Sequence, residues 1–441
     1  MATDGIRGKG EGDMTRKTSE LIENGMRRLL KRMHLYQVVR NLLYVLGFRH
    51  SQKMIAIPLD RLLCGGENGL SAAQYARHTG NLLRPSTLFS RSPYVQFLEQ
   101  YLRMGDDIFR PEVFRKTAYF ANAVECINAA GSYYSCTRED ELEQIAKYFI
   151  RQFEHRQRQG DTATPGPHFL PLGSPLRLRR VQYSDYYEVV EDAHNAAVAL
   201  VRGEKTHASY LTPDAATTPL QQLLLDHAFT CDGRPRLYQP VESPEVEKWQ
   251  LIRRCSDRFE LIRRFLHDQN LMPPGCDGYL DIACNYGWFV KAFGELGFRA
   301  RGVEMDWAAV ELGKLVYGLR PDQITRSEAV RFLKDHPQRY DVTSCFSLLH
   351  HFLLGRASVS GEEMLRLIDR MTGTVLFLDM GQCHEEWFRE SLAGWDADRI
   401  EQWILDNSSF TKVYRLGKDC DSVEPYQNNY GRTLFACTRS I

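Results

Sequence analysis

Two carboxylates near the ends of apolar strands are the residues of this sequence best placed to do chemistry. Asp281 lies in the apolar stretch at residues 279–284, and Glu304 ends a second short strand that begins at Arg301. A carboxylate in the position of Glu304 can accept hydrogen bonds from both hydroxyls of a ribose. Asp281 can accept hydrogen bonds from an ammonium group. Together they predict a site for a nucleoside cofactor that carries a cationic group.

The residues between the first strand and the next helix form a turn with little side-chain bulk. Asn285, Tyr286 and Gly287 connect this strand to a helix that we expect over residues 288–296. A compact turn lets backbone N–H groups approach a ligand closely. Ala283 is also small, and asparagine tolerates left-handed backbone angles. The sequence therefore predicts that the turn lines the cofactor site.

The elements that position these residues alternate between strand and helix from residue 280 onward. This alternation is typical of a parallel sheet covered by helices on both faces. In such a sheet, ligands collect beyond the carboxyl ends of the strands. A seventh, weaker strand is expected near Gln323, and six clearer ones begin near Tyr279, Arg299, Asp341, Gly373, Thr411 and Arg432.

Two motifs resemble those of the class I S-adenosylmethionine (SAM) dependent methyltransferases. Residues 281–287 read Asp-Ile-Ala-Cys-Asn-Tyr-Gly, where the family has Asp-x-Gly-Cys-Gly-x-Gly, so Ala283 and Asn285 replace two glycines. Residues 340–351, which end in Leu-His-His, resemble the fourth motif of the family. The resemblance covers roughly residues 237–441. It implies an α/β fold with a seven-stranded Rossmann-like sheet, SAM as cofactor and no metal.

The resemblance also implies which residues contact the cofactor. The adenine is held after the third strand in this family, and Glu328 lies there, although it could instead be a carboxylate at a helix start. A nicotinamide-dinucleotide domain is the alternative, but the Gly-x-Gly-x-x-Gly pattern that it needs is missing. The predicted cofactor-binding residues are Asp281, Ala283, Asn285, Tyr286, Gly287, Glu304, Met305, Glu328 and Ser347.

The loops after the fourth and fifth strands should face the methyl group that is transferred. A hydroxyl acceptor must lose its proton, and a neutral imidazole is the side chain best suited to take it. We therefore predict that one of His350, His351 and His384 is a catalytic base, and that Gln382 and Glu385 bind acceptor hydroxyls. The alternative for the two adjacent histidines is a structural role in shaping their loop.

The middle of the chain carries a second, local resemblance. Residues 187–199 read Tyr-Glu-Val-Val-Glu-Asp-Ala-His-Asn-Ala-Ala-Val-Ala and resemble the core of ParB-like domains. Asp192 and Asn195 stand where that family has a glycine and an arginine near nucleotide phosphates. The extra carboxylate repels phosphate, and the bidentate grip of the arginine is lost. We expect a degenerate, mixed α/β ParB-like domain over residues 53–213 that serves as scaffold or recognition module, with His194 in a structural role.

The remaining segments complete the expected organisation. Residues 1–52 form an N-terminal segment, in which residues 14–48 have the pattern of a basic amphipathic helix. This helix packs on the next domain or, alternatively, contacts an anionic membrane surface or nucleic-acid phosphates. Residues 214–235 read as a linker, and residues 236–441 as the methyltransferase domain. A leading helix is expected over residues 247–267, preceding the first strand.

The leading hypothesis is methyl transfer from SAM to an oxygen, or in second place a nitrogen, of a small molecule or glycan. Basic and acidic residues number 56 each, and no Asn/Asp-Pro-Pro-Tyr motif is present, so nucleic acid is not the expected partner. The alternative is a nucleic-acid-associated ParB-like protein whose methyltransferase domain modifies nucleic acid or senses SAM. A catalytically inactive interaction protein is a third class that the sequence leaves open, as it does the oligomeric state.

Cysteine usage and hydropathy bear on the compartment. Eleven scattered cysteines, with no Cys-x-x-Cys pair, argue against a disulfide scaffold and a zinc site. No stretch is long and apolar enough to span a bilayer. A cytoplasmic protein is expected, with peripheral membrane contact through residues 14–48 as a further possibility.

Overall fold

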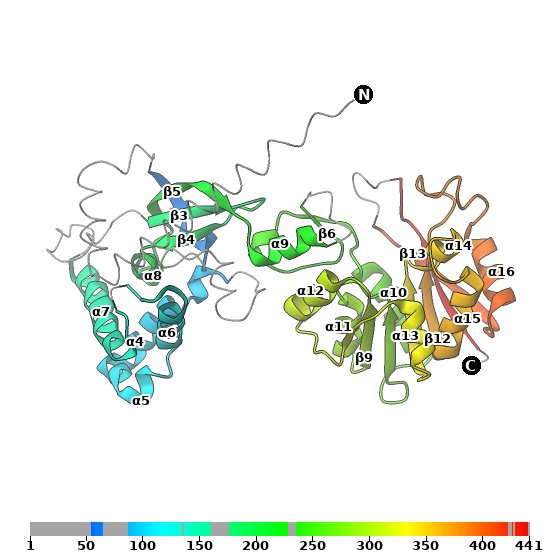
Figure 1. Ribbon diagram of the computed structural model, residues 1–441, viewed down its shortest axis with the longest axis horizontal. Coiled ribbons are helices and arrows are strands. Elements are labelled where there is room, and N and C mark those ends of the chain that lie inside the picture. The colour runs from blue at the N-terminus through cyan, green and yellow to red at the C-terminus, as the bar shows by residue number, and fades with distance from the viewer. Residues whose placement is uncertain are drawn as a thin grey trace, which may run out of the picture. The chain divides into compact units, whose positions relative to one another are not determined.

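The computed structural model describes residues 54–64, 87–134, 136–159, 176–227, 235–421, 426 and 428–439 (Figure 1). The predicted basic helix at residues 14–48 lies outside these ranges. The chain divides into two compact units, an N-terminal unit up to Pro219 and a C-terminal unit from Leu220 to Ile441. This division falls inside the stretch that was interpreted as a linker. No helix in the described ranges is long and apolar enough to cross a membrane.

The N-terminal unit is a mixed α/β fold, as predicted. Its sheet has the order β1-β5-β3-β4-β2, and both parallel and antiparallel pairs occur in it. The strands are β1 (Ile55–Pro58), β2 (Leu62–Leu63), β3 (Leu176–Val181), β4 (Tyr187–Glu191) and β5 (Thr206–Ala216). The helices are α4 (Pro93–Met104), α5 (Pro111–Phe114), α6 (Ala118–Ala130), α7 (Leu142–Gln159) and α8 (Ala193–Val201).

The start of α8 holds the residues of the ParB-like resemblance. Asp192, which replaces a family glycine, keeps a left-handed backbone with φ of 68°. The His194 ring stacks on Phe149 with 4.0 Å between ring centroids, and its Nε2 lies 3.0 Å and 3.3 Å from the hydroxyls of Tyr119 and Tyr133. Burial lowers the pKa of His194 to about 3. A neutral imidazole inside an aromatic core fits the structural role expected of it; the ParB-like assignment stays a prediction.

The C-terminal unit has the seven-stranded Rossmann-like sheet that the sequence predicts. Its order is β10-β9-β8-β11-β12-β14-β13, and β14 is antiparallel to both neighbours while the other pairs are parallel. The order reverses between β8 and β11, and sheets of this kind bind ligands at the carboxyl ends of the strands beside such a reversal. The strands are β8 (Gly278–Ile282), β9 (Arg299–Glu304), β10 (Ile324–Arg326), β11 (Tyr340–Phe346), β12 (Thr372–Asp379), β13 (Lys412–Lys418) and β14 (Thr433–Thr438).

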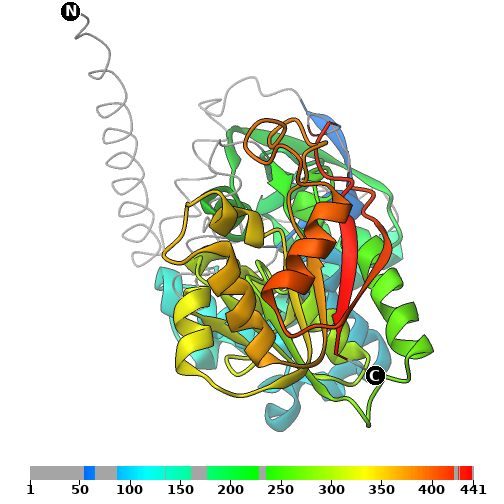
Figure 2. The same cartoon turned by 90° about the vertical axis from the view of Figure 1, so that its right-hand side faces the viewer.

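Alternating apolar side chains attach helices to both faces of this sheet. On β12, Val375 and Phe377 pack into one core cluster, while Leu376 and Leu378 pack into the other. The first cluster includes residues of α10 (Ser256–Asp268), α11 (Trp288–Glu295) and α12 (Trp307–Tyr317). The second includes residues of α13 (Ala329–Asp335), α14 (Leu349–Leu353), α15 (Gly361–Met371) and α16 (Ala397–Asn407). Figure 2 turns α13, α15 and α16, yellow to orange-red, toward the viewer.

Two boundaries differ from the sequence-based expectation. The predicted linker contains the end of β5 and the helix α9 (Pro219–Asp226). The leading helix, expected from residue 247, begins only at Ser256, because the chain before it forms β7 (Gln250–Leu251), which pairs with β6 (Arg236–Leu237). Cys255, with φ of 63°, breaks the helix there, and this bend directs the buried Arg253 into the protein.

Candidate functional site

The turn after β8 has three residues in left-handed backbone conformation. The φ angles are 60° at Ala283, 55° at Asn285 and 82° at Gly287. Asn285 therefore keeps the conformation of the family glycine that it replaces, and its side chain adds contacts. Its Nδ2 donates to Nε2 of His227 at 3.2 Å, at the end of α9, and its Oδ1 accepts from the Tyr286 N–H at 2.9 Å. The Asn285 side chain therefore joins the turn to His227 and also bonds the backbone of the turn itself.

Close packing fixes this turn against its neighbours. A Cβ atom added to Gly287 would lie 2.6 Å from Leu319, and one added to Gly302 of β9 would lie 2.6 Å from Sγ of Cys284. At Gly313 of α12 the added atom would lie 2.4 Å from the carbonyl oxygen of Tyr286. Only glycine permits so close an approach of the turn to β9 and α12.

Glu304 lies at the end of β9 with its carboxylate facing this turn. One oxygen accepts from the N–H groups of Met305 at 2.7 Å and Asp306 at 2.9 Å, and the other accepts from the Asn285 N–H at 2.9 Å. Burial raises the pKa of Glu304, and these N–H groups partly offset that rise. Three of about four acceptor positions are filled, so one remains for a ribose hydroxyl. Glu304 can accept from both ribose hydroxyls only if it gives up its hydrogen bond to one of these three N–H groups.

Asp281 is a buried carboxyl group in the centre of the sheet, 2% exposed. Its Oδ1 accepts from the Ser344 hydroxyl at 2.6 Å, and that hydroxyl also meets the Tyr279 hydroxyl at 2.6 Å. Burial raises the pKa of Asp281 to about 7, although Ser344 and Arg258 act to lower it. A cationic group beside Asp281 would lower this pKa and restore the charge.

The other predicted cofactor residues divide by exposure. Met305 is 67% exposed beside Glu304, where a ligand can reach it. The Tyr286 side chain is fully buried, and its hydroxyl accepts from the Tyr238 N–H at 3.4 Å, so it has no route to a ligand. The carboxylate of Glu328 accepts from two N–H groups in the first turn of α13, at 3.0 Å and 2.8 Å. Glu328 thus has the alternative role that the sequence left open, that of a carboxylate at the start of a helix.

The acceptor side of the crevice is organised by Asp379 at the end of β12. Its Oδ2 accepts from Arg258 at 2.7 Å, and its Oδ1 accepts from both the N–H and the hydroxyl of Ser347, at 2.8 Å and 3.1 Å. Burial alone would raise the pKa of Asp379, but Arg258, Arg253 and Arg432 hold it well below its usual range. Ser347 follows β11 with φ of 56°. Asp379 therefore fixes the turn in which Ser347 lies.

Glu385 forms a buried bidentate ion pair with Arg432, with both contacts at 2.8 Å. The same carboxylate accepts from the N–H groups of Gln382 at 2.8 Å and Tyr430 at 3.1 Å. All four acceptor positions are filled and the side chain is fully buried. The prediction that Glu385 binds acceptor hydroxyls is corrected: it anchors two loops. Gln382 is 2% exposed, and its Nε2 has no hydrogen-bond partner among the described residues.

The three candidate bases have different surroundings. His350 is buried, and its Nδ1 accepts from the Gly381 N–H at 3.2 Å. Burial, with Arg432 and His351 as further causes, lowers the pKa of His350 to about 2. Because Nδ1 accepts from the Gly381 N–H, Nε2 of the neutral ring carries its proton and no lone pair is left for a substrate proton, which favours the structural alternative for His350. His351 lies on the exposed side of the short helix α14, and desolvation of its ring, followed by the charge of Arg356, lowers its pKa.

His384 has the geometry of a base whose orientation is fixed. It is exposed in the loop after β12, and its Nε2 lies 2.7 Å from the carbonyl oxygen of Tyr430. Because a carbonyl only accepts, Nε2 carries the proton and Nδ1 of the neutral ring keeps a free lone pair. His384 is therefore the strongest of the three candidates.

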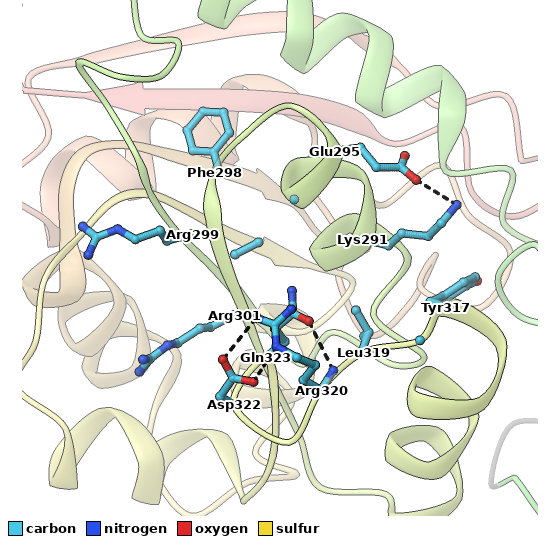
Figure 3. A pocket seen from close by; sticks show the side chains of 13 residues that line it. Lys291, Glu295, Phe298, Arg299, Arg301, Tyr317, Leu319, Arg320, Asp322 and Gln323 are labelled. Carbon is cyan, nitrogen blue, oxygen red and sulfur yellow. Dashed lines mark hydrogen bonds and ion pairs between the residues drawn. The ribbon is translucent and has the colours of Figure 1, made fainter.

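A cavity of about 630 Å³ lies at the opposite edge of the sheet (Figure 3). It is bordered by α11, the start of β9 and the residues before β10, so it is separate from the carboxyl edge. Ion pairs join Lys291 to Glu295 at 3.3 Å and Arg320 to Asp322 at 3.1 Å within its lining. Among the described residues, no cluster of His, Cys, Asp and Glu could hold a metal ion.

Sequence reasoning missed several residues of this site. Asp379 ends an apolar strand as Glu304 does, a signal that could have identified it. Arg253 and Arg432 gave no comparable signal, because their partners are distant in sequence. Trp387, half-exposed in the loop after β12, lay within the expected acceptor region but was not named.

Comparisons with known proteins give partial similarities. No protein-family model matches the chain. A stretch of 75 residues is 35% identical to the ubiquinone biosynthesis O-methyltransferase of Saccharophagus degradans; it covers 16% of this chain and 31% of that protein. The chain thus spans about a third of this curated relative.

Three of the solved structures to which parts of the chain are similar are methyltransferases by name. The bifunctional kinase-methyltransferase WbdD has 17% identity and a TM-score of 0.39, over 50% of this chain and 46% of WbdD. Magnesium protoporphyrin IX methyltransferase (ChlM) from Synechocystis PCC 6803, with bound SAM, has 15% identity and a TM-score of 0.31, over 42% and 79%. A SAM-dependent methyltransferase from Archaeoglobus fulgidus has 17% identity and a TM-score of 0.29, over 41% and 94%.

The raised pKa of Asp281 predicts a pH-dependent stability. The folded protein keeps this proton up to about pH 7, whereas the unfolded chain releases it near pH 4, so stability falls as pH rises between these values. Replacing Asp281 with Asn should remove about 2 kcal/mol of the decrease between pH 5 and pH 7, measured by urea unfolding. Asp277→Asn changes a carboxylate that is 42% exposed and should keep the wild-type dependence. Equal pH profiles in all three proteins would contradict the assignment.

Proposed function

We propose that the C-terminal unit is a SAM-dependent methyltransferase. The observation that carries the proposal is the pair Asp281 and Glu304, on the adjacent strands β8 and β9, joined by a left-handed turn whose Asn285 N–H reaches Glu304. This arrangement lies where the strand order reverses, which is the ligand-binding position of such sheets. The partial sequence similarity to an O-methyltransferase supports the same conclusion.

Each part of the cofactor has a matching group in this chain. The ammonium group of SAM would meet Asp281, and a ribose hydroxyl would fill the open acceptor position of Glu304. The exposed Met305 would cover the adenosine moiety beside it. Ser347, held by Asp379 at the end of the neighbouring strand β12, borders the crevice on the acceptor side.

The acceptor in this proposal is an oxygen, in second place a nitrogen, of a small molecule or glycan. SAM bound at this site would supply the methyl group to the acceptor oxygen and would leave as S-adenosylhomocysteine, a neutral thioether. Catalysis therefore depends mainly on alignment of donor and acceptor away from water. The hydroxyl proton passes to Nδ1 of His384, while Nε2–H stays bonded to Tyr430. The N-terminal unit would serve as scaffold or recognition module.

Cofactor binding tests the proposal without knowledge of the acceptor. S-adenosylhomocysteine should bind the full chain in calorimetry, and Glu304→Ala should weaken binding by roughly 2 to 4 kcal/mol, because charge-assisted hydrogen bonds to ribose are lost. Glu328→Gln is the control: because that side chain caps α13, affinity should change little. No binding to the wild type would refute the proposal, and equal binding to Glu304→Ala would remove this residue from the site.

Turnover tests the assignment of the base. With an acceptor that supports methyl transfer, His384→Ala should lower the rate at saturating SAM on the order of a hundredfold, and leave S-adenosylhomocysteine affinity unchanged. His351→Ala is the matched control and should change the rate little. A near-normal rate in His384→Ala would leave alignment alone as the mechanism.

A further inference from the structure

Exposed apolar side chains of the C-terminal unit gather at the ligand edge of its sheet. Among its described residues, the exposed large hydrophobic side chains are Met305, Trp307 and Trp387. The first two follow β9, beside Glu304, and Trp387 lies in the loop after β12 that also carries His384. Trp387 is 46% exposed. Apolar side chains that gather at the ligand-binding edge of a sheet, rather than singly over the surface, point to a surface that a ligand covers.

Trp387 belongs to a group of three aromatic rings, which we call the aromatic platform: Trp387, Tyr426 and Tyr430. The Trp387 ring lies 5.2 Å from Tyr426 and 5.6 Å from Tyr430, with interplanar angles of 65° and 85°. These edge-to-face contacts support the tryptophan from the side and leave part of it open. Arg253 lies beneath Tyr430, with its guanidinium carbon 4.4 Å from the ring centroid.

The platform is held rigidly by bonds between two loops. The Trp387 N–H donates to Oδ1 of Asn429 at 3.0 Å, and the Glu386 N–H donates to the carbonyl oxygen of Asn428 at 3.0 Å. Tyr430 has a left-handed backbone with φ of 63°, which is strained for an aromatic residue. Its N–H and carbonyl are fixed by Glu385 and His384. Strain of this kind is typical of functional sites.

We propose that the aromatic platform binds a sugar ring of the methyl acceptor, so that the acceptor is a glycan or glycoside. This inference rests on the proposed methyltransferase function. A sugar ring has an apolar C–H face that can lie on the open part of Trp387, and hydroxyls around its rim. Glu386, which precedes Trp387 in the chain, and Asn428, whose Nδ2 donates to Glu386 at 3.4 Å, provide polar groups for such hydroxyls.

The polar surroundings distinguish a sugar from a flat aromatic acceptor. A planar aromatic ligand is usually bound in an apolar cleft that covers most of its surface. Trp387 is instead half-exposed, and two polar side chains lie next to its loop contacts: Glu386 precedes it in the chain and accepts a hydrogen bond from Nδ2 of Asn428 at 3.4 Å. The same loop carries His384, so a sugar on the platform would bring a hydroxyl toward the proposed base.

A glycan array with the full-length chain tests this inference. Fluorescently labelled protein, saturated with S-adenosylhomocysteine, should bind at least one class of oligosaccharide. The affinity for that oligosaccharide should fall at least about tenfold in Trp387→Ala and stay within about threefold in Trp387→Phe, which keeps an aromatic face. Tyr183→Ala, which removes an aromatic side chain of the N-terminal unit that is 50% exposed, should bind as the wild type does.

The same samples separate this inference from the proposed function. S-adenosylhomocysteine affinity should be equal in the wild type and Trp387→Ala. If the cofactor product binds but no oligosaccharide does, or if sugar binding survives in Trp387→Ala, the platform proposal is wrong and the methyltransferase proposal stands. If catechol, tested by calorimetry, binds in a Trp387-dependent way while sugars do not, the acceptor is aromatic and the sugar proposal is overturned. Failure of S-adenosylhomocysteine to bind overturns the proposed function itself.

Discussion

A buried network of arginines and carboxylates is the constraint on which the acceptor side of the site depends. Its centre is Asp379 at the end of β12, and its other members lie in α10 and just before it, in the loop after β12, and between β13 and β14. Charges so deeply buried are tolerated only when they are paired, and removal of one partner costs about 3–5 kcal/mol. The network consists of Arg253, Arg258, Arg432, Asp379, Glu385, Asp419 and Asp421.

The network links parts of the chain that carry the proposed chemistry. Asp379 fixes Ser347 after β11, while Glu385 fixes Tyr430 and thereby the carbonyl that orients His384. Arg258 also acts on Asp281, whose pKa it lowers against the effect of burial. The cofactor turn is held independently, by close packing at glycines and by the hydrogen bond between Asn285 and Glu304. The turn at Asn285 and the residues around Asp379 are therefore each held in place by their own set of contacts.

The sequence predicted the elements better than the contacts. Strand periodicity located the seven strands, and the position of Glu304 at a strand end was correct because local pattern determines both. The pattern could not show that Glu385 pairs with Arg432, because the two residues meet only in the folded chain. It also could not separate His350 from His384, since burial, which lowers the pKa of the former, depends on tertiary packing. The late start of α10 has the same cause, because the chain before it pairs as β7 with the distant β6.

Hydrogen exchange measured by mass spectrometry tests most directly whether this network preorganises the acceptor side. We compare the wild type with Arg432→Met and with a control, Arg415→Met. The control removes the ion pair between Arg415, whose side chain is 41% exposed, and Glu401. Peptides with the Ser347 and Tyr430 amides should exchange slowly in the wild type and in Arg415→Met. In Arg432→Met they should exchange about a hundredfold faster, while the Asn285 turn stays protected. Unchanged protection of both peptides in Arg432→Met would contradict this preorganisation.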